Sequence, residues 1–199
     1  VAEQCRRGGV LIKEGADVGS GSPEGTLTLA KGEEPMAFDR ILNIAGPWAE
    51  KLLTDSCIKP RYSLDLVRGS HLVLGFPCLH ALLLEVPGEK RVIFLLPWKG
   101  RSLVGTTEVR QTLDAPIACS AEEADHLIRA YNHFHARRIG LADIVETFAG
   151  IRPLVKSASN PTHARRDYVF QQDGKLLTVF GGKWTTSPAL AEKLKRKMH

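Results

Sequence analysis

The 199-residue sequence lacks several patterns that would assign it to a familiar class of protein. Its four cysteines (Cys5, Cys57, Cys78 and Cys119) lie far apart and form no C-x-x-C pair, which favours free thiols in a reducing compartment over a disulfide framework. No apolar run approaches the ~20 residues of a membrane span, and no basic segment followed by an apolar one marks a signal peptide. The seven histidines show no zinc-ligand spacing, and neither a nucleophile elbow nor a P-loop is present, so we expect no metal site.

The remaining composition is typical of a soluble globular protein, with 43% hydrophobic and 25% charged residues. The net charge is +5, and part of the basic excess crowds the C-terminus at Lys193, Lys195, Arg196 and Lys197. Such a cluster is typical of a solvated helix end that complements the helix dipole, with contact to anionic lipid as the alternative. The other basic segments lack the interleaved aromatic residues of a nucleic-acid platform, so we expect no nucleic-acid partner.

The N-terminal region has the pattern of short strands that lead into a helix. Residues 9–12 and 26–30 are typical of two short strands, and the nearly continuous apolar run at 40–45 is typical of a strand buried on both faces. Gly46 follows this run, and Pro47 suits the first turn of a helix because its missing N–H is not needed there. A strand, a glycine turn and a helix start in succession direct backbone N–H groups toward a bound anion or dipole.

The middle of the chain is rich in β-formers. Residues 66–74, 91–96 and 102–107 are separated by Gly and Pro without a helical pattern between them, which favours antiparallel pairing. A helix is predicted at 121–138, followed by strands at 168–171 and 176–180 and a helix from about residue 185. This order predicts an α/β (α+β) fold in which the chain leaves one domain, builds a second and returns to the first. The expected boundaries are 1–58, 59–144 and 145–199.

Residues 180–186 (FGGKWTT) are the most informative segment. The glycine pair at 181–182 allows a ligand to approach the backbone closely, and Lys183 adds a positive charge beside the free N–H groups of a helix start. This arrangement favours a site for a phosphate or a reduced, anionic flavin ring. The alternative is a tight turn with Thr185 or Thr186 as the N-cap of the helix.

Arg152 and His71 are the two other candidates for chemistry. Arg152 lies between apolar residues, and the proline that follows holds it extended. Burial of its charge is costly without an anionic partner. The forked guanidinium suits a carboxylate or a phosphate. The alternative is a pair with a local Glu or Asp. His71 lies in an apolar strand, and its near-neutral pKa suits it to accept a hydroxyl proton. The alternative is a hydrogen-bonded structural histidine.

Six short segments, taken in order, resemble the FAD-dependent glycerol-3-phosphate dehydrogenases. They are residues 43–48 (NIAGPW), 68–71 (RGSH), 97–98 with 103–107 (PW and LVGTT), 150–153 (GIRP), 166–168 (RDY) and 181–186 (GGKWTT). Each segment is individually modest, and their order makes the match specific. The similarity runs from about residue 40 to the C-terminus.

The resemblance implies a glutathione-reductase-like FAD domain, completed by both ends of the chain, and an antiparallel sheet domain that covers the substrate. By analogy, glycerol 3-phosphate loses hydride from C2 to the flavin, which gives dihydroxyacetone phosphate, and a quinone then reoxidises the flavin. The parent enzyme is expected in the cytoplasm, and a peripheral contact with the inner membrane is left open.

The resemblance also assigns roles by position. His71 and Arg152 would be catalytic, with His71 as the base or orienting group for the C2 hydroxyl. Arg152, Arg166 and Lys183 would bind the phosphorylated substrate. The residues that would face the flavin are Gly46, Gly182, Lys183 and Thr185.

The sequence departs from the family in ways that bear on activity. Residues 1–40 contain no G-x-G-x-x-G turn between a strand and a helix, which the family uses for the FAD pyrophosphate. Trp184 and the Ser-Pro pair at 187–188 replace the usual leucine and tyrosine-arginine. The chain does not begin with Met, so we expect a piece of a longer protein. Because the pyrophosphate turn is missing, we expect this piece alone to bind FAD weakly or not at all and to be inactive.

Two rival interpretations remain open from the sequence. One is a related flavoprotein that oxidises an amine or a 2-hydroxy acid. The other is a non-catalytic module that binds a phosphorylated metabolite through Arg152, Arg166 and Lys183. The sequence leaves the electron acceptor and the oligomeric state open.

Overall fold

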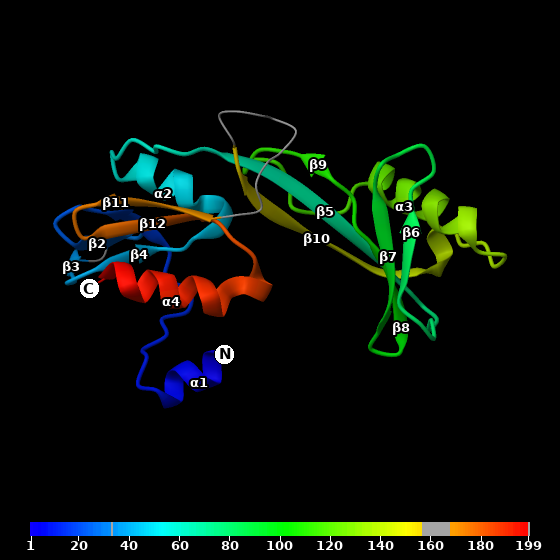
Figure 1. The fold of residues 1–199 in the computed structure, drawn as a ribbon, viewed down its shortest axis with the longest axis horizontal. Coiled ribbons are helices and arrows are strands. Elements are labelled where there is room, and N and C mark those ends of the chain that lie inside the picture. Colours follow the sequence, from blue (N-terminus) through cyan, green and yellow to red (C-terminus); the bar gives the residue numbers. More distant parts are fainter. Residues whose placement is uncertain (33, 157–167, 199) are drawn as a thin grey trace. The chain divides into compact units, whose positions relative to one another are not determined.

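The structure is a computed structural model that describes residues 1–32, 34–156 and 168–198. The chain forms two compact units (Figure 1). Unit 1 combines both ends of the chain, Val1–Ser63 and Asp167–His199, and unit 2 is the intervening segment Leu64–Arg166. The predicted mixed α/β fold with an antiparallel sheet in the inserted part is confirmed.

Unit 1 contains two three-stranded sheets within the described residues. The first is antiparallel and consists of β1 (Val18–Gly21), β2 (Thr26–Leu29) and β3 (Met36–Ala37). In the second, β12 (Leu176–Gly181) lies between the antiparallel β11 (Tyr168–Asp173) and the parallel β4 (Ile41–Asn43). The helical elements are α1 (Ala2–Arg7), η1 (Gly46–Trp48), α2 (Ala49–Asp55), η3 (Trp184–Thr186) and α4 (Ser187–Met198).

The second sheet of unit 1 is covered on both faces, since α2 and α4 lie on opposite sides of it (Figure 1). Successive residues of a strand point to opposite faces. Leu177 and Val179 therefore pack with Leu194 of α4, whereas Phe180 is fully buried on the other face. On that side α2 buries Leu53 completely. The two helices thus fix the position of β12 and of the chain that leaves it.

Two predictions for the N-terminal region are wrong. The predicted strand at 9–12 does not form, because this segment directly follows the short helix α1 and leaves Leu11 exposed without a partner strand. The strand predicted at 40–45 is limited to β4, and it is not buried on both faces. Leu42 is 37% exposed because β4 lies at the edge of its sheet.

Unit 2 is built on one antiparallel sheet with strand order β10-β5-β8-β7-β6, and β9 pairs with β5 beside this path. Its strands are β5 (Leu64–Leu74), β6 (Leu82–Glu85), β7 (Val92–Trp98), β8 (Arg101–Gly105), β9 (Val109–Arg110) and β10 (Ile144–Val155). Helix α3 (Ala121–Phe134) and η2 (Leu141–Asp143) connect β9 to β10. This confirms the antiparallel pairing predicted for the middle of the chain.

The C-terminal boundary of the inserted unit differs from the prediction. Residues 145–166 were expected in the returning domain, but β10 pairs with β5 from residue 144 to residue 155. A strand that is hydrogen-bonded along its length to another strand belongs to the same sheet. The structure therefore places residues 145–155 in unit 2.

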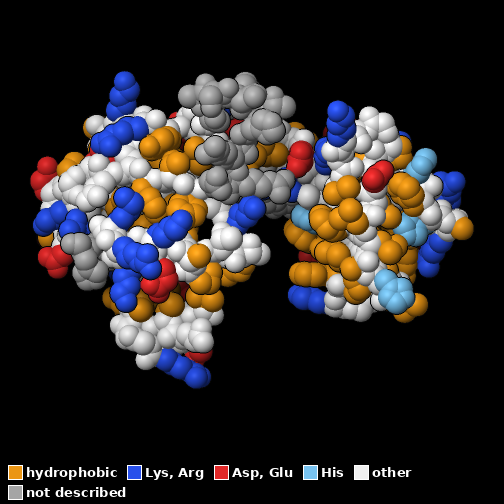
Figure 2. All heavy atoms as spheres, in the orientation of Figure 1, with side chains coloured by type: hydrophobic (Ala, Val, Ile, Leu, Met, Phe, Trp, Pro, Cys, Tyr) orange, Lys and Arg blue, Asp and Glu red, His pale blue; other side chains and the backbone are white. Residues whose placement is uncertain are grey.

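Helix α3 covers one face of the unit 2 sheet. Leu127 and Tyr131 of α3 are buried against Leu72, Leu95 and Val104 of the strands. The helix begins with a capping box in which Ser120 and Glu123 bond each other's backbone N–H, and it ends at Phe134, four residues before the predicted end. The opposite face keeps apolar side chains exposed, and Figure 2 shows hydrophobic side chains gathered over this unit. None of the described helices is long and apolar enough to cross a membrane.

Candidate active site

In unit 1 the candidate contacts lie where two parallel strands end. Leu177 of β12 is paired with Leu42 of β4, and Thr178 with Asn43. Because the strands are parallel, the chain leaves both of them at the same edge of the sheet, which is the usual position of ligand sites in open α/β sheets. The segments that follow are η1 after β4 and η3 after β12.

Glycines give this edge its backbone conformation. Gly46 has a φ of 58° at the start of η1, and Gly181 and Gly182 have φ values of 77° and 96°. This left-handed region is costly for residues with a Cβ. The structure thus brings Gly46, Gly182, Lys183 and Thr185 to the ends of neighbouring strands. The N-cap residue of η3 is Lys183, without a side-chain cap.

Asn43 ties the two strand ends together. It is buried, and its Nδ2 donates to the Ala49 carbonyl at 2.9 Å and to Thr178 Oγ1 at 3.3 Å. The Ala45 N–H donates back to Asn43 Oδ1 at 3.3 Å. A buried amide with partners on both segments fixes their relative positions. The edge is therefore a preformed feature of the unit.

Large apolar side chains are exposed in the same two segments. Ile44 is 66% exposed, Trp48 48% and Trp184 79%. A Cβ at Gly46 would meet nothing within 4 Å, so there is open space against the backbone. Exposed apolar surface beside a glycine backbone that a ligand can approach closely suits a flat heteroaromatic group. A flavin ring fits this edge.

In unit 2 a single cross-strand row holds the candidate base. The pairs Leu83–Phe94, Phe94–Gly105, Gly105–His71 and His71–Phe148 link five strands in register. Directly paired residues share a face of the sheet. The row lies on the face opposite α3, and its members other than glycine are exposed or half-buried.

Gly105 and Phe148 determine where the His71 ring lies. A Cβ at Gly105 would be 2.3 Å from His71 Cδ2, so the ring occupies the space that a side chain would need. The Phe148 ring stacks on it with centroids 4.8 Å apart and an interplanar angle of 12°. Burial, and then the positive charge of Arg152, lower the pKa of His71 below its usual value. His71 Nδ1 is buried and has no hydrogen-bond partner among the described residues.

Arg152 lies on the same face, four residues along β10 from Phe148. Its Nη2 donates to Thr106 Oγ1 at 3.0 Å, and its Nη1 donates to the Thr107 carbonyl at 3.4 Å. A Cβ at Gly69 would be 2.5 Å from Arg152 Nη2, so the guanidinium packs directly on the backbone of β5. The structure thus brings His71 and Arg152 together, as a neutral imidazole near a cation.

A buried carboxylate supports this face from behind. Glu123 of α3 accepts hydrogen bonds from Ser70 Oγ at 2.8 Å and Thr107 Oγ1 at 2.5 Å, and it pairs with Arg68 at 2.7 Å. Burial alone would raise the pKa of this carboxyl, but these bonds and the Ser120 N–H outweigh it and lower the pKa. Arg68 is therefore a structural partner of α3.

Several residues of this face were not predicted from the sequence. The positions concerned lie within or beside the segments quoted above: Gly105, Thr106 and Phe148. Gly105 could have been found from its type, because a glycine inside a strand often marks the close approach of another group. Glu123 had no signal beyond its place in a capping box. The predicted phosphate ligand Arg166 lies outside the described residues, and Lys183 lies in unit 1, not in unit 2 with Arg152.

The sequence matches the family described as "FAD dependent oxidoreductase" over residues 1–196. The chain belongs to this family. It is 36% identical over 172 residues to the aerobic glycerol-3-phosphate dehydrogenase of Escherichia coli (strain K12), with 79% of this chain and 34% of that protein covered. It is also 36% identical over 163 residues to the D-erythritol 1-phosphate dehydrogenase of Brucella abortus (strain 2308), with 77% and 32% covered.

Solved structures of the same fold include the glycerol-3-phosphate dehydrogenase of Bacillus halodurans complexed with FAD, with a TM-score of 0.74 at 24% identity over 94% of this chain and 36% of that one. The L-α-glycerophosphate oxidase of Mycoplasma pneumoniae with FAD bound has a TM-score of 0.67 at 18% identity over 92% and 49%. The chain thus spans about a third of the length of the curated relatives.

Proposed function

We propose that this chain is the substrate-handling part of an FAD-dependent dehydrogenase that oxidises glycerol 3-phosphate to dihydroxyacetone phosphate. The observation that carries the proposal is the pairing of His71 and Arg152 on one face of unit 2. An alcohol that carries a phosphate needs a cation for the anion and a neutral base for the hydroxyl proton. The similarity to dehydrogenases of polyol phosphates supports this substrate class.

The side chains divide the work in the following way. Arg152 binds and orients the anionic substrate, and Lys183 and Arg166 add positive charge as further substrate ligands. His71 accepts the proton of the C2 hydroxyl, because burial and the charge of Arg152 keep its imidazole neutral. The flavin ring would be held by Gly46, Gly182, Lys183 and Thr185, and it would supply the acceptor for the hydride of C2.

The flavin nucleotide is held only in part by this chain. The edge formed after β4 and β12 suits the ring, but no G-x-G-x-x-G turn for the pyrophosphate occurs in residues 1–40. We therefore propose that the 199 residues alone retain FAD weakly and are inactive.

A second substrate is supported by one specific observation. The D-erythritol 1-phosphate dehydrogenase matches this chain at the same 36% identity as the glycerol-3-phosphate dehydrogenase of Escherichia coli. Both named substrates are polyol phosphates and differ in chain length. Erythritol 1-phosphate is therefore the alternative, and the contacts of Arg152 and His71 serve it equally well.

The electron acceptor and the location form the last part of the proposal. A quinone as acceptor, and a cytoplasmic enzyme that contacts the inner face of a membrane, are supported by the resemblance and by the basic end of α4. Of that cluster, Lys193 and Lys197 lie over the rings of Tyr168 and Phe170. Sedimentation of the protein with anionic vesicles tests the membrane contact. We expect the protein to sediment with the vesicles at low salt and to be released at about 0.5 M salt, which screens surface charge.

The substrate is tested in protein expressed from the complete reading frame and loaded with FAD. Under anaerobic conditions, bleaching of the flavin absorbance is followed after addition of glycerol 3-phosphate, erythritol 1-phosphate, lactate or glycine. We expect fast bleaching by a polyol phosphate, and loss of about 100-fold or more in the Arg152→Gln variant. Faster reduction by lactate or glycine in the wild type would contradict the proposed substrate class.

A further inference from the structure

Two arginines share the short segment that follows β8. Arg152 bonds the side chain of Thr106 and the carbonyl of Thr107, as described above. Arg91 Nη2 donates to the carbonyl oxygen of Thr106 at 2.8 Å. Thr106 and Thr107 therefore hold two arginines: Arg152 of β10 and Arg91, which directly precedes β7.

The next residue, Glu108, divides its carboxylate between the same two arginines. Its Oε1 is 3.9 Å from Arg152 Nη1, and its Oε2 is 3.8 Å from Arg91 Nε. Both distances are ion-pair distances that are too long for a hydrogen bond. All three side chains are partly exposed, so each attraction is screened by water. The carboxylate is thus shared and is held tightly by neither partner.

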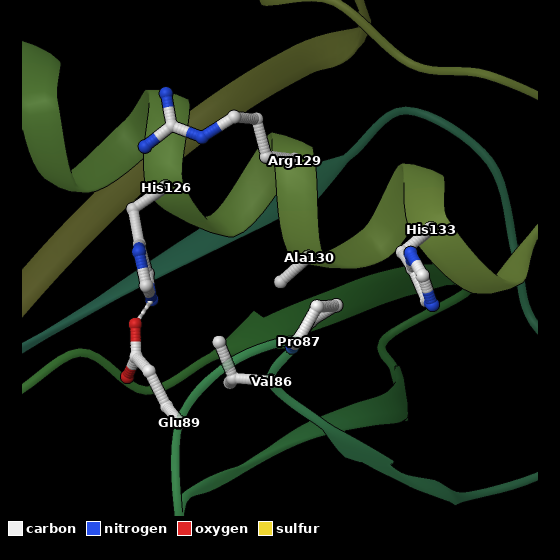
Figure 3. Close-up of a pocket in the computed structure, with 7 residues that line it drawn as sticks. All are labelled: Val86, Pro87, Glu89, His126, Arg129, Ala130 and His133. Carbon is white, nitrogen blue, oxygen red and sulfur yellow. Dashed lines mark ion pairs between the residues drawn. The ribbon is translucent and has the colours of Figure 1, made fainter.

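Arg91 also has a second carboxylate, Glu89. Arg91 Nη1 lies 3.4 Å from Glu89 Oε2, and Glu89 Oε1 lies 3.8 Å from His126 Nε2. Figure 3 shows Glu89 directed toward His126 of α3, at a pocket of about 410 Å³. The charges alternate from Glu89 through Arg91 and Glu108 to Arg152. Because Glu89 neutralises part of the Arg91 charge, Arg91 attracts the Glu108 carboxylate less strongly, and this carboxylate can also pair with Arg152.

We propose that Glu108 is a positioning residue that sets the anion affinity of Arg152, and that Arg91 determines how much of the Glu108 charge reaches Arg152. The proposal rests on the proposed role of Arg152 as a ligand of the substrate phosphate. A carboxylate next to Arg152 competes with an incoming anion. When the anion binds to Arg152, the Glu108 carboxylate moves away from Arg152 and stays paired with Arg91. The negative charge of Glu108 is therefore never left without a partner.

The test uses two variants of the 199-residue chain that act in opposite directions. Glu108→Gln removes the competing charge, so binding of inorganic phosphate tightens by about threefold, the size expected for a screened ion pair. Arg91→Gln leaves the whole Glu108 charge to Arg152, so phosphate binding weakens by a similar factor. The double variant binds phosphate about as tightly as Glu108→Gln does, because Arg91 has no carboxylate left to withdraw from Arg152. Phosphate binding is followed by NMR titration.

A second readout does not depend on a ligand. The charge of Arg152 lowers the pKa of His71, so Glu108→Gln lowers this pKa further and Arg91→Gln raises it. Arg61→Gln is the matched control, since it breaks a 2.8 Å surface ion pair with Asp173 in unit 1 and moves neither readout. Shifts of phosphate affinity in the same direction for both variants, or a His71 pKa that moves in neither, would overturn the proposal.

Arg152→Gln separates this inference from the proposed function. Phosphate binding that survives in Arg152→Gln shows that another site binds the anion, which contradicts the proposed role of Arg152 as the substrate ligand. The opposite shifts of the His71 pKa in Glu108→Gln and Arg91→Gln still decide whether the Glu108 carboxylate is shared.

Discussion

The two units build their candidate contacts by different means. In unit 1 the contacts come from the backbone at the ends of β4 and β12, and Gly46 and Gly182 are required there for their positive φ angles. In unit 2 the contacts come from the side chains of His71 and Arg152, and glycine is required for space, as at Gly105. Glycine is thus needed for its backbone conformation in unit 1 and for its lack of a side chain in unit 2. Substitutions of glycine should therefore destabilise the two units for different reasons.

The largest effect is expected where unit 2 depends on a buried charge. Glu123→Gln removes the carboxylate that pairs with Arg68 and accepts bonds from Ser70 and Thr107. Leaving the largely buried Arg68 without its counter-charge costs about 3 kcal/mol of unfolding free energy, measured by urea denaturation. Glu122→Gln, at the exposed neighbouring position, is the control and changes the free energy little. A loss below about 1 kcal/mol for Glu123→Gln would show that the network contributes little.

The same network gives unit 2 an acid sensitivity. The pKa of Glu123 is lowered in the folded protein, so the stability it contributes is present above the ordinary carboxyl pKa of about 4.3 and is lost as the pH falls through the lowered value. We expect the unfolding free energy of the wild type to fall over this range. In Glu123→Gln this part of the pH dependence is absent, and an unchanged slope would contradict the assignment.

The next effect tests space as the reason for glycine in unit 2. Gly105→Ala places a Cβ 2.3 Å from the His71 ring, so the ring must move, at a cost of about 2 kcal/mol. Gly150→Ala is the matched control, because a Cβ there meets nothing within 4 Å. The imidazole NMR signals of His71 should shift in Gly105→Ala and remain in place in Gly150→Ala. If the His71 signals and the unfolding free energy change equally in the two variants, lack of space is not the reason for glycine at position 105.

A smaller effect tests conformation as the reason for glycine in unit 1. Gly46 has a φ of 58° and open space around its Cβ position. Gly46→Ala is expected to cost about 1 kcal/mol, whereas Gly46→Asn costs less because Asn tolerates the left-handed region. Thermal unfolding measures both. If Asn is as destabilising as Ala, the backbone conformation is not the reason for glycine at this position.

The smallest effect concerns the pH dependence of His71. Its pKa is lowered from the ordinary value of 6.5, so the unfolded chain binds more protons than the folded one between the two values. The stability linked to His71 is therefore present above pH 6.5 and is lost as the pH falls through the lowered value. His71→Gln abolishes this window, and His133→Gln, at an exposed position on α3, leaves it in place. A window that persists in His71→Gln would assign it to another group.

The sequence was informative where the signal is local and weaker where it depends on pairing. The strand and glycine pair at 176–182 and the antiparallel arrangement of the β-rich segments between 66 and 107 were predicted, because period and turn residues reveal them. The boundary at 145 was not, since only pairing with β5 assigns β10 to unit 2. The supporting roles of Glu123 and Glu108 also escaped prediction, because each contacts residues far away in the sequence.

The central claim is that this chain holds the edge for a flavin ring without the site for the nucleotide tail. Fluorescence titration of the 199-residue chain with lumiflavin, which is the ring alone, and with FAD tests it most directly. Because the tail finds no phosphate-binding turn, the two dissociation constants should agree within about threefold. Binding of FAD that is about 100-fold tighter than that of lumiflavin would contradict the claim.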